Sequence, residues 1–266
     1  MADWLSRLLF RRGGGGSRTA QGVAVVRSGF ERPHTPDGDP DAQSLLSQGM
    51  RAGRAPLLRD HLLARTKFFD AVVLDALGRG IDQIVIVGAG YDDRAFRFRS
   101  PGVRFFELDH PATQADKRLR VKALGDGPTF VAADFTRDSV ADALAGGGHD
   151  ASRPTLFICE GLVIYLEANE IVELLAALRS CAAEGSELAI SLAVHPEGVP
   201  SSAVVNAANV ARRGGRGEPW RTILPTAEHL ALLQKAGWAE EEARDDSDLV
   251  PQARPMRSLL VRARPG

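Results

Sequence analysis

Two glycines that directly follow a short apolar run are the first residues whose spacing suggests chemistry. The run Ile84–Val87 is β-branched throughout, and Gly88-Ala89-Gly90 follows it without a break. A continuous apolar run of this length is typical of a strand buried on both faces. Glycines after such a strand let the chain turn tightly and let a ligand approach the backbone. We therefore expect Gly88, Ala89 and Gly90 to bind a cofactor, although purely structural turns use the same glycines.

The residues after this turn bear on which cofactor it could hold. A dinucleotide-binding turn has the pattern Gly-x-Gly-x-x-Gly, but Asp93 stands at the third glycine position and Asp92 precedes it. Carboxylates beside a pyrophosphate would repel it. S-adenosylmethionine has no phosphate and carries a sulfonium and an ammonium group, so the two acids favour this cofactor over a nicotinamide dinucleotide. Acids at this position also suit the first turn of a helix, and both interpretations can hold together.

Acidic residues also stand where three further predicted strands end. Parallel strands deliver their carboxyl ends to one edge of a sheet, where open α/β sheets bind ligands. Glu107 and Asp109 lie about 20 residues past the glycine turn, and either could accept the ribose hydroxyls. Asp134 could accept the adenine amino group with Phe135 against the ring, and Glu160 would lie at the same edge. The sequence therefore predicts a nucleoside-type ligand at this edge.

These residues need a sheet to bring them together, and the remaining pattern supplies one. Helical patterns separate the apolar runs, which argues for an α/β fold with a doubly wound, mostly parallel sheet of the Rossmann-like type. The predicted strands are Ile84–Val87, Val103–Leu108, Phe130–Ala133, Thr155–Cys159, Leu188–Val194 and Ser258–Val261.

The chain divides into a short extension and one larger unit. Residues 1–40 contain a glycine run and a stretch rich in Pro, Gly and Asp, which predicts a flexible N-terminal extension. Residues 41–266 are expected to form a single domain, with a helical cap over 41–80 and a Rossmann-like core over 81–266. An insert near 196–222 is expected to cover the acceptor site.

Composition excludes several classes of partner. The formal net charge of -1 gives no general attraction to nucleic acid or to an anionic membrane surface. No apolar run is long enough to cross a bilayer, and the two cysteines form neither a disulfide framework nor a metal-type pair. We therefore expect a cytoplasmic protein without a metal site, acting on a small molecule or a peptide.

Several stretches taken together resemble the leucine carboxyl methyltransferase family, and within it the bacterial S-adenosylmethionine-dependent O-methyltransferases. The resemblance covers about residues 41–178 well and the rest loosely. The region 196–222 is poorly matched, which leaves the acceptor open. The matching stretches are Ala64–Asp70, Val87–Ala95, Phe106–Gln114, Ala133–Phe135 and Glu160–Leu166.

The resemblance implies a role for each matching position. Arg65 would hold the carboxylate of the cofactor, and Gly88 and Gly90 would form the turn under its methionine portion. Asp109, rather than Glu107, would take the ribose hydroxyls. Asp134 and Phe135 would hold adenine, and Glu160 would face the methionine ammonium. This chain departs from the family at Asp93, where the family usually has Thr, and at Phe135, where it usually has Leu.

The implied reaction is an in-line methyl transfer that depends mainly on alignment and exclusion of water. A carboxylate acceptor needs no general base, whereas a hydroxyl would benefit from one. The candidates for such a base are His110, Tyr165 and His195, each of which could equally have a structural role. Two other functions stay open from sequence: a nicotinamide-dependent oxidoreductase, which the missing third glycine disfavours, and a non-catalytic cofactor-binding protein of the same fold.

Overall fold

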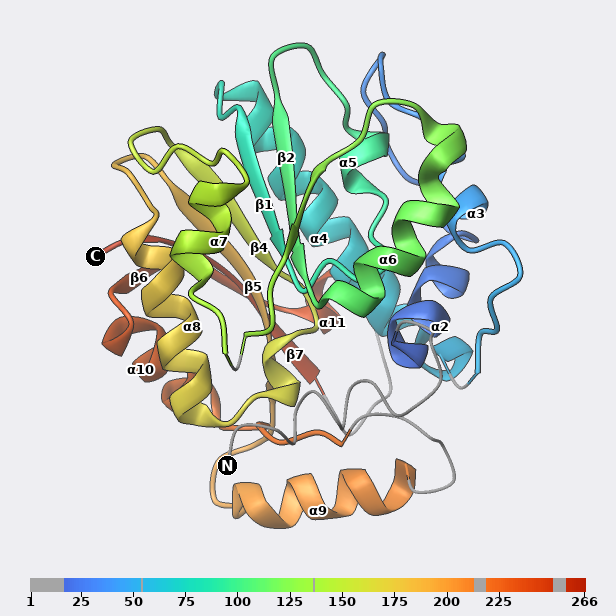
Figure 1. Ribbon diagram of the computed structural model, residues 1–266. Helices are drawn as coiled ribbons and strands as arrows, with labels where there is room; N and C mark the ends of the chain where they lie inside the picture. Colours follow the sequence, from blue (N-terminus) through green and yellow to red (C-terminus); the bar gives the residue numbers. More distant parts are fainter. Residues whose placement is uncertain (1–16, 54, 136, 213–218, 251–256) are drawn as a thin grey trace.

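The computed structural model describes residues 17–53, 55–135, 137–212, 219–250 and 257–266 (Figure 1). A seven-stranded sheet runs through the described part of the chain in the order β3-β2-β1-β4-β5-β7-β6. The strands are β1 (Gln83–Val87), β2 (Arg104–Asp109), β3 (Thr129–Ala132), β4 (Thr155–Cys159), β5 (Glu187–Val194), β6 (Trp238–Asp245) and β7 (Arg257–Pro265).

Neighbouring strands from β3 to β5 are parallel, and β7 is antiparallel to both β5 and β6. The chain order reverses beside β1, because β1 pairs with β2 on one side and with β4 on the other. This is the point at which open α/β sheets bind ligands. The predicted α/β class with a mostly parallel sheet is confirmed.

Helices cover both faces of the sheet (Figure 1). One apolar core packs α7, α8 and α10 against β1, β4 and β5, and the other packs α2, α3, α4 and α5 against the opposite face. Side chains on both faces explain why β1 and β4 are apolar and buried at every position. The helix bounds on the first face are α7 (Val140–Gly146), α8 (Ala168–Ser180) and α10 (Thr226–Lys235); on the second, α2 (Arg18–Arg27), α3 (Ala42–Leu46), α4 (Arg59–Gly78) and α5 (Arg94–Arg97).

Shorter elements and two further long helices, α6 and α9, complete the described part of the fold. Helix α6 follows β2 and runs into η2, and η3 follows β4. Helix α11 directly follows β6 and packs against α4. The bounds are η1 (Ala55–Leu58), α6 (Pro111–Arg120), η2 (Val121–Leu124), η3 (Val163–Tyr165), α9 (Ser201–Arg212) and α11 (Asp246–Leu249).

All six predicted strands are present, and β6 is one that the sequence did not predict. Five of its eight residues are charged, and Trp238 is the buried residue of the strand. β6 lies at one edge of the sheet and, among the described strands, pairs with β7 alone, with an irregularity between Glu240 and Glu242. A charged, irregular edge strand lacks the apolar alternation that marks a strand, because its side chains face water.

The structure differs from the expected flexible extension over residues 17–40. Helix α2 begins after Ser17, whose hydroxyl accepts from the Ala20 amide, and it packs against η1 and α4. Within it, Gly22 lies so close to the Ala52 carbonyl that a Cβ there would be 2.8 Å from that oxygen. Residues 1–16 lie outside the described part of the chain. The α2 segment is therefore held by tertiary contacts that local composition does not reveal.

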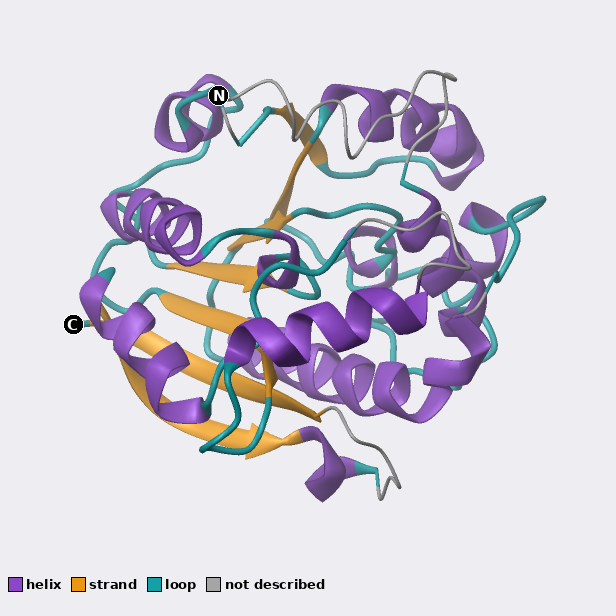
Figure 2. Ribbon diagram, turned by 90° about the horizontal axis from the view of Figure 1, so that it is seen from below, coloured by secondary structure: helices purple, strands orange, loops and turns teal. Residues whose placement is uncertain are grey.

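The region predicted as an insert, 196–222, contains α9. This helix lies across the edge of the sheet at which the parallel strands end (Figures 1 and 2). Asn209 on α9 bonds through its side chain to both the amide and the carbonyl of Trp220. Residues 213–218 lie outside the described part of the chain. Within the described residues, no helix combines the length and the apolar character needed to cross a membrane.

Candidate functional site

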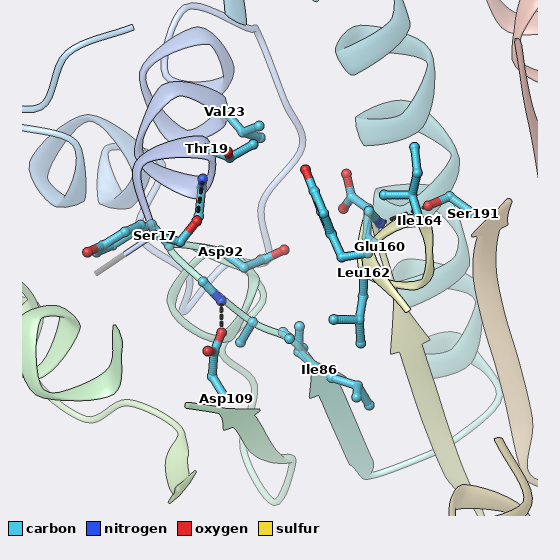
Figure 3. A pocket seen from close by; sticks show the side chains of 18 of the residues that line it. Ser17, Thr19, Val23, Ile86, Asp92, Asp109, Glu160, Leu162, Ile164 and Ser191 are labelled. Carbon is cyan, nitrogen blue, oxygen red and sulfur yellow. Dashed lines mark hydrogen bonds between the residues drawn. The ribbon is translucent and has the colours of Figure 1, made fainter. Parts of the chain in front are cut away.

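A cavity opens at the carboxyl ends of β1, β2, β4 and β5, beside α2 and the first turns of α4. Figure 3 shows Thr19 and Val23 of α2 on one side, Asp109 below, and Glu160 with Ser191 on the other side. Every residue predicted to bind the cofactor lines this cavity. These residues are Arg65, Gly88, Ala89, Gly90, Asp109, Asp134, Phe135 and Glu160.

The glycine turn forms the floor of the cavity. Gly88 and Gly90 have φ angles of +66° and +48°, in the left-handed region that favours glycine. A Cβ on Gly88 would lie 2.9 Å from the Leu162 side chain. The amide of Gly90 donates to Asp109 Oδ2 at 2.5 Å, and the amide of His110 donates to Asp109 Oδ1 at 2.6 Å. The turn and the end of β2 are therefore fixed to each other through one carboxylate.

The structure shows which of Asp109 and Glu107 faces the cavity, a choice that the residues alone left open. Asp109 faces the cavity, whereas Glu107 pairs with Lys117 at 2.6 Å behind it, and Lys117 also donates to the Asp92 carbonyl. Burial raises the pKa of Asp109 while the amides of Gly90 and His110 oppose the shift. Burial raises the pKa of Glu107 to about 7, against the attraction of Lys117. Asp109 is therefore the acid available to a ligand, and Glu107 braces the turn.

Three guanidinium groups converge on Glu160, which directly follows β4. Arg27 bonds Glu160 Oε1 at 2.7 Å, Arg65 Nε bonds the same oxygen at 3.0 Å, and Arg94 bonds Oε2 at 2.6 Å. Arg94 and Arg27 also contact Asp92, at 2.5 and 3.3 Å. Burial alone would raise the pKa of Glu160, but Arg27, Arg94 and Arg65 hold it well below its usual value. Glu160 is therefore ionised at the cavity wall.

A second layer of ion pairs lies behind this cluster and explains Asp93. Asp93 is fully buried, does not cap α5 through its side chain, and instead pairs with Arg32 at 2.5 Å and with Arg97 at 2.7 Å. Burial opposes ionisation of Asp93, yet Arg32 and Arg97 lower its pKa. Arg32 also pairs with Asp70, as does Arg94. Asp92, by contrast, lines the cavity and accepts from the Arg94 amide, so it supports the start of α5 while lying at the cavity wall.

Arg27 and Gly161 are site residues that sequence reasoning missed. Arg27 closes α2 and reaches across the cavity to Glu160, and its Nε is buried without a hydrogen-bond partner among the described residues. Gly161 has φ of +67°, and a Cβ there would lie 3.0 Å from the Arg65 guanidinium nitrogens. Gly161 follows Glu160 directly in the sequence, so its place after an apolar strand was a signal for it. Nothing local marked Arg27.

The three candidate bases have different positions. His110 lines the cavity, but its Nδ1 accepts from the Ala112 amide and so caps α6. Burial lowers the pKa of His110. Tyr165 lies in the cavity wall on η3. His195 does not line the cavity: its Nδ1 lies 2.7 Å from the Pro196 carbonyl and its Nε2 2.9 Å from Ser201 Oγ. The structure therefore gives His195 a turn role.

Comparison with known proteins decides the family. The family defined as leucine carboxyl methyltransferase matches residues 21–179. The chain belongs to this family. Its enzyme class and cofactor, as expected from the sequence, are confirmed: it is an S-adenosylmethionine-dependent methyltransferase. This result removes the support for the oxidoreductase alternative.

Individual relatives agree with the family. A predicted S-adenosyl-L-methionine-dependent methyltransferase of Parafrankia sp. (strain EAN1pec) is 34% identical over 251 residues, covering 87% of this chain and 79% of that protein. A second, from Streptomyces coelicolor, is 36% identical over 192 residues, covering 65% of this chain and 68% of that protein.

Solved structures show the same fold at low identity. A predicted methyltransferase from Thermobifida fusca YX has a TM-score of 0.59 and 17% identity, covering 93% of this chain and 94% of that one. Magnesium protoporphyrin IX methyltransferase from Synechocystis PCC 6803, solved with bound S-adenosylhomocysteine, has a TM-score of 0.52 and 15% identity, covering 78% of this chain and 85% of that one.

Proposed function

We propose that this methyltransferase transfers the methyl group to an oxygen, a carboxylate or a hydroxyl, of a small molecule or a peptide. The observation that carries the proposal is that one cavity has two kinds of lining residue. Besides the glycine turn and its acids, apolar side chains and a few hydroxyl groups line the same cavity. Apolar walls of this kind can hold an acceptor and exclude water. These further residues are Leu58, Ile164, Leu166, Ser191, Trp220 and Ser258.

The residues of the glycine turn and of the strand ends beside it fit S-adenosylmethionine. Asp109 would accept the ribose hydroxyls, and Asp134 with Phe135 would hold adenine. Gly88 to Gly90 would pass under the methionine portion, whose ammonium would face Glu160. These roles follow from the family motif and from the shared cavity wall.

The carboxylate of the cofactor has a matching place at the arginine cluster. The connected ion pairs contain five arginines and four acids, so the cluster carries one excess positive charge. Arg27 and Arg65 both line the cavity, Arg27 Nε has no hydrogen-bond partner among the described residues, and Arg65 packs closely on Gly161. A carboxylate between Arg27 and Arg65 would satisfy that charge through charge-assisted hydrogen bonds. The members are Arg27, Arg32, Arg65, Arg94, Arg97, Asp70, Asp92, Asp93 and Glu160.

Bound S-adenosylmethionine supplies a methyl group already activated on a sulfonium. The chain's own contribution is alignment: Glu160 and the arginines fix one end, Asp109 the other, and the apolar wall at Ile164 and Trp220 keeps water out. An ionised carboxylate acceptor would need nothing more. The family description, which names a carboxyl target, supports oxygen as the acceptor atom.

Two measurements test the proposal. The first is calorimetric titration with S-adenosylhomocysteine, for which we expect micromolar affinity and one site per chain. The second uses methyl-labelled S-adenosylmethionine with panels of carboxylic acids, phenols, amines and thiols. Alkaline treatment releases methanol from methyl esters but leaves ethers, methylamines and thioethers intact, so it identifies carboxyl methylation, and the class of compound methylated identifies the acceptor atom of the alkali-stable products. Transfer only to nitrogen or sulfur would refute the proposal, and binding without any transfer would favour a non-catalytic protein.

A further inference from the structure

A buried ion pair lies behind the glycine turn, and the roles proposed for the cofactor site do not use it. Glu107 of β2 and Lys117 of α6 each expose 1% of the side chain. Lys117 Nζ donates to Glu107 Oε2 at 2.6 Å and to the backbone carbonyl of Asp92 at 2.7 Å. One ammonium group therefore connects α6 both to β2 and to the chain just after the glycine turn.

Glu107 stands on a face of the sheet that is mostly apolar. Its partners in β1 and β3 and the preceding residue on the same face of β2 are all apolar: Ile86, Phe130 and Phe105. The charged groups that face Glu107 come from the turn after β1, from its own strand and from α6: Asp92, Asp109 and Lys117. Two of these three are acids, so Lys117 alone among them stabilises the ionised form of Glu107.

Stability does not explain this pair. A buried ion pair commonly contributes no more to stability than an apolar pair of similar volume, because both charges lose their hydration. Glu107 Oε1 is also buried without a hydrogen-bond partner among the described residues. Burial raises the pKa of Glu107 from 4.5 to about 7, although Lys117 opposes the shift. Because this pKa is higher in the folded chain than in the unfolded chain, ionisation of Glu107 lowers the free energy of unfolding, and the full cost is present above about pH 7.

The contacts of Lys117 place it between the two parts of the cofactor site. On one side, its partner Glu107 lies two residues before Asp109, which accepts from the Gly90 amide (Figure 3). On the other side, Lys117 holds the carbonyl of Asp92, whose carboxylate belongs to the arginine cluster. A displacement of this ammonium group would therefore move the ribose acceptor and the arginine cluster relative to each other.

Resting on the cofactor roles proposed above, we propose that Lys117, paired with ionised Glu107, is a positioning residue that holds the turn and the end of β2 in the arrangement that S-adenosylmethionine requires. Lys117 touches no ligand, because it is buried behind the cavity and does not line it. It acts through Asp92 and Glu107, and a small misplacement of binding groups is enough to weaken their bonds to a ligand. When Glu107 is protonated or replaced, the charge attraction is lost and the turn is held less firmly to β2.

The first test removes both charges together and so separates positioning from stability. In the double variant Lys117→Met/Glu107→Leu, two apolar side chains of similar volume replace the pair, and the midpoint of denaturant unfolding should equal or exceed that of the wild type. Calorimetry should nevertheless show that S-adenosylhomocysteine binds about tenfold more weakly, because the turn has lost its link to β2. Wild-type affinity in the folded double variant overturns the inference.

Two control variants accompany the double variant. Lys122→Met makes the same replacement at an exposed lysine of η2, which directly follows α6. Gln83→Met removes buried hydrogen bonds at the other end of β1, where Gln83 Nε2 donates to the Asp150 carbonyl at 2.9 Å, away from the cavity lining. Gln83→Met should lower stability, yet both controls should bind S-adenosylhomocysteine within about twofold of the wild type. Weakening in Gln83→Met as large as in the double variant would show that any damage to the sheet has this effect, and it overturns the inference.

The second test uses the pH profile of the wild type and so does not depend on a variant that folds. The ligand is 5′-methylthioadenosine, which has no group that titrates between pH 6 and 8, so its affinity reports on the protein alone. Glu107 passes from mostly ionised to mostly protonated over this range, and affinity should fall about fivefold from pH 8 to pH 6. The double variant should lack this fall, although it keeps His110 and the other titrating groups of the cavity. A flat wild-type profile, or parallel profiles of the two proteins, overturns the inference.

Failure of the proposed function is visible in different measurements. Methyl transfer only to nitrogen or sulfur refutes oxygen methylation and changes neither of the binding results above. Absence of S-adenosylhomocysteine binding by the folded wild type refutes the cofactor roles, and the role of Lys117 with them. The role of Lys117 alone is refuted when the wild type binds the ligand and the double variant binds it equally well at every pH.

Discussion

Arg27, the last residue of α2, and Glu160, which follows β4, are joined by a 2.7 Å ion pair although they lie 133 positions apart in the chain. The pair closes the cavity between the N-terminal helix and the sheet edge. The same helix brings Ala20 close to Gly90 on the opposite side of the turn. Residues 17–27 therefore form one wall of the candidate cofactor site, and a cofactor carboxylate at Arg27 would link that wall to the sheet.

Replacing Arg27 should weaken binding of the amino-acid portion alone. For Arg27→Met we expect affinity for S-adenosylhomocysteine to fall about 10- to 100-fold, because a charge-assisted hydrogen bond contributes about 1.5–3 kcal/mol. Affinity for 5′-methylthioadenosine, which lacks the carboxylate, should change little. Calorimetry with both ligands measures this contrast. Arg18→Met, which removes an exposed arginine from the same helix, is the control. Equal weakening of both ligands would contradict the placement of Arg27.

Replacing Asp109 should instead weaken binding of the nucleoside portion of the ligand. Asp109→Ala removes a charged acceptor from the cavity wall, so both S-adenosylhomocysteine and 5′-methylthioadenosine should bind less tightly by about 1.5–3 kcal/mol. Asp109→Asn keeps one acceptor oxygen for the amides of Gly90 and His110 and controls for damage to the turn. It should give a smaller loss. Unchanged affinity in a folded Asp109→Ala protein would disprove the ribose role.

The sequence predicted those parts of the fold and site that depend on local pattern. β1 and β4 are continuous apolar runs because helices cover both faces, and the positions after them fall at the ligand-binding edge by topology alone. The strand pattern therefore suffices to place Gly88 and Gly90 at this edge, together with the acids at the end of β2. The choice of Asp109 over Glu107 came from family resemblance, since strand alternation puts both on one face.

The remainder depends on contacts between distant segments. Arg27 reaches the site because α2 packs on α4, yet its helix is short and contains Gly22, so no apolar face marks it. His61 meets Asp246 across 185 positions, and neither residue stands in a recognisable motif. A buried polar pair of this kind gives no periodic signal, because one polar residue on each element is enough to form it.

Alanine substitutions at Gly90 and Gly102 should distinguish the effect of backbone strain on stability from the effect of crowding on ligand binding. Gly90 and Gly102 both have positive φ angles, +48° and +77°. A Cβ on Gly90 would lie 3.1 Å from the Ala20 side chain, whereas one on Gly102 would meet nothing within 4 Å. Both alanine variants should lose about 1–2 kcal/mol of unfolding free energy from strain in the left-handed region. Only Gly90→Ala should also weaken the binding of S-adenosylhomocysteine, because the added methyl group displaces α2. Denaturant titration and calorimetry measure the two effects.

Stability should fall on mild acidification because of His229, a histidine buried on α10. Its Nε2 donates to the Ala193 carbonyl at 2.8 Å, and burial lowers its pKa from 6.5 to about 4. Between these pH values His229 is protonated in the unfolded chain but neutral in the folded chain. The free energy of unfolding therefore decreases as pH falls from 6.5 to 4. A shift of this size corresponds to roughly 3 kcal/mol. Above pH 6.5 the contribution is complete.

His229→Gln tests this, because the glutamine amide can still donate to Ala193 but does not titrate. Denaturant titrations between pH 4 and 7 should show a shallower dependence in the variant than in the wild type, by up to the same roughly 3 kcal/mol over the range. His34→Gln is the control, since His34 is exposed and its replacement should leave the wild-type slope unchanged. If His229→Gln and the wild type lose stability in parallel on acidification, other groups, and not the buried imidazole, drive the acid sensitivity.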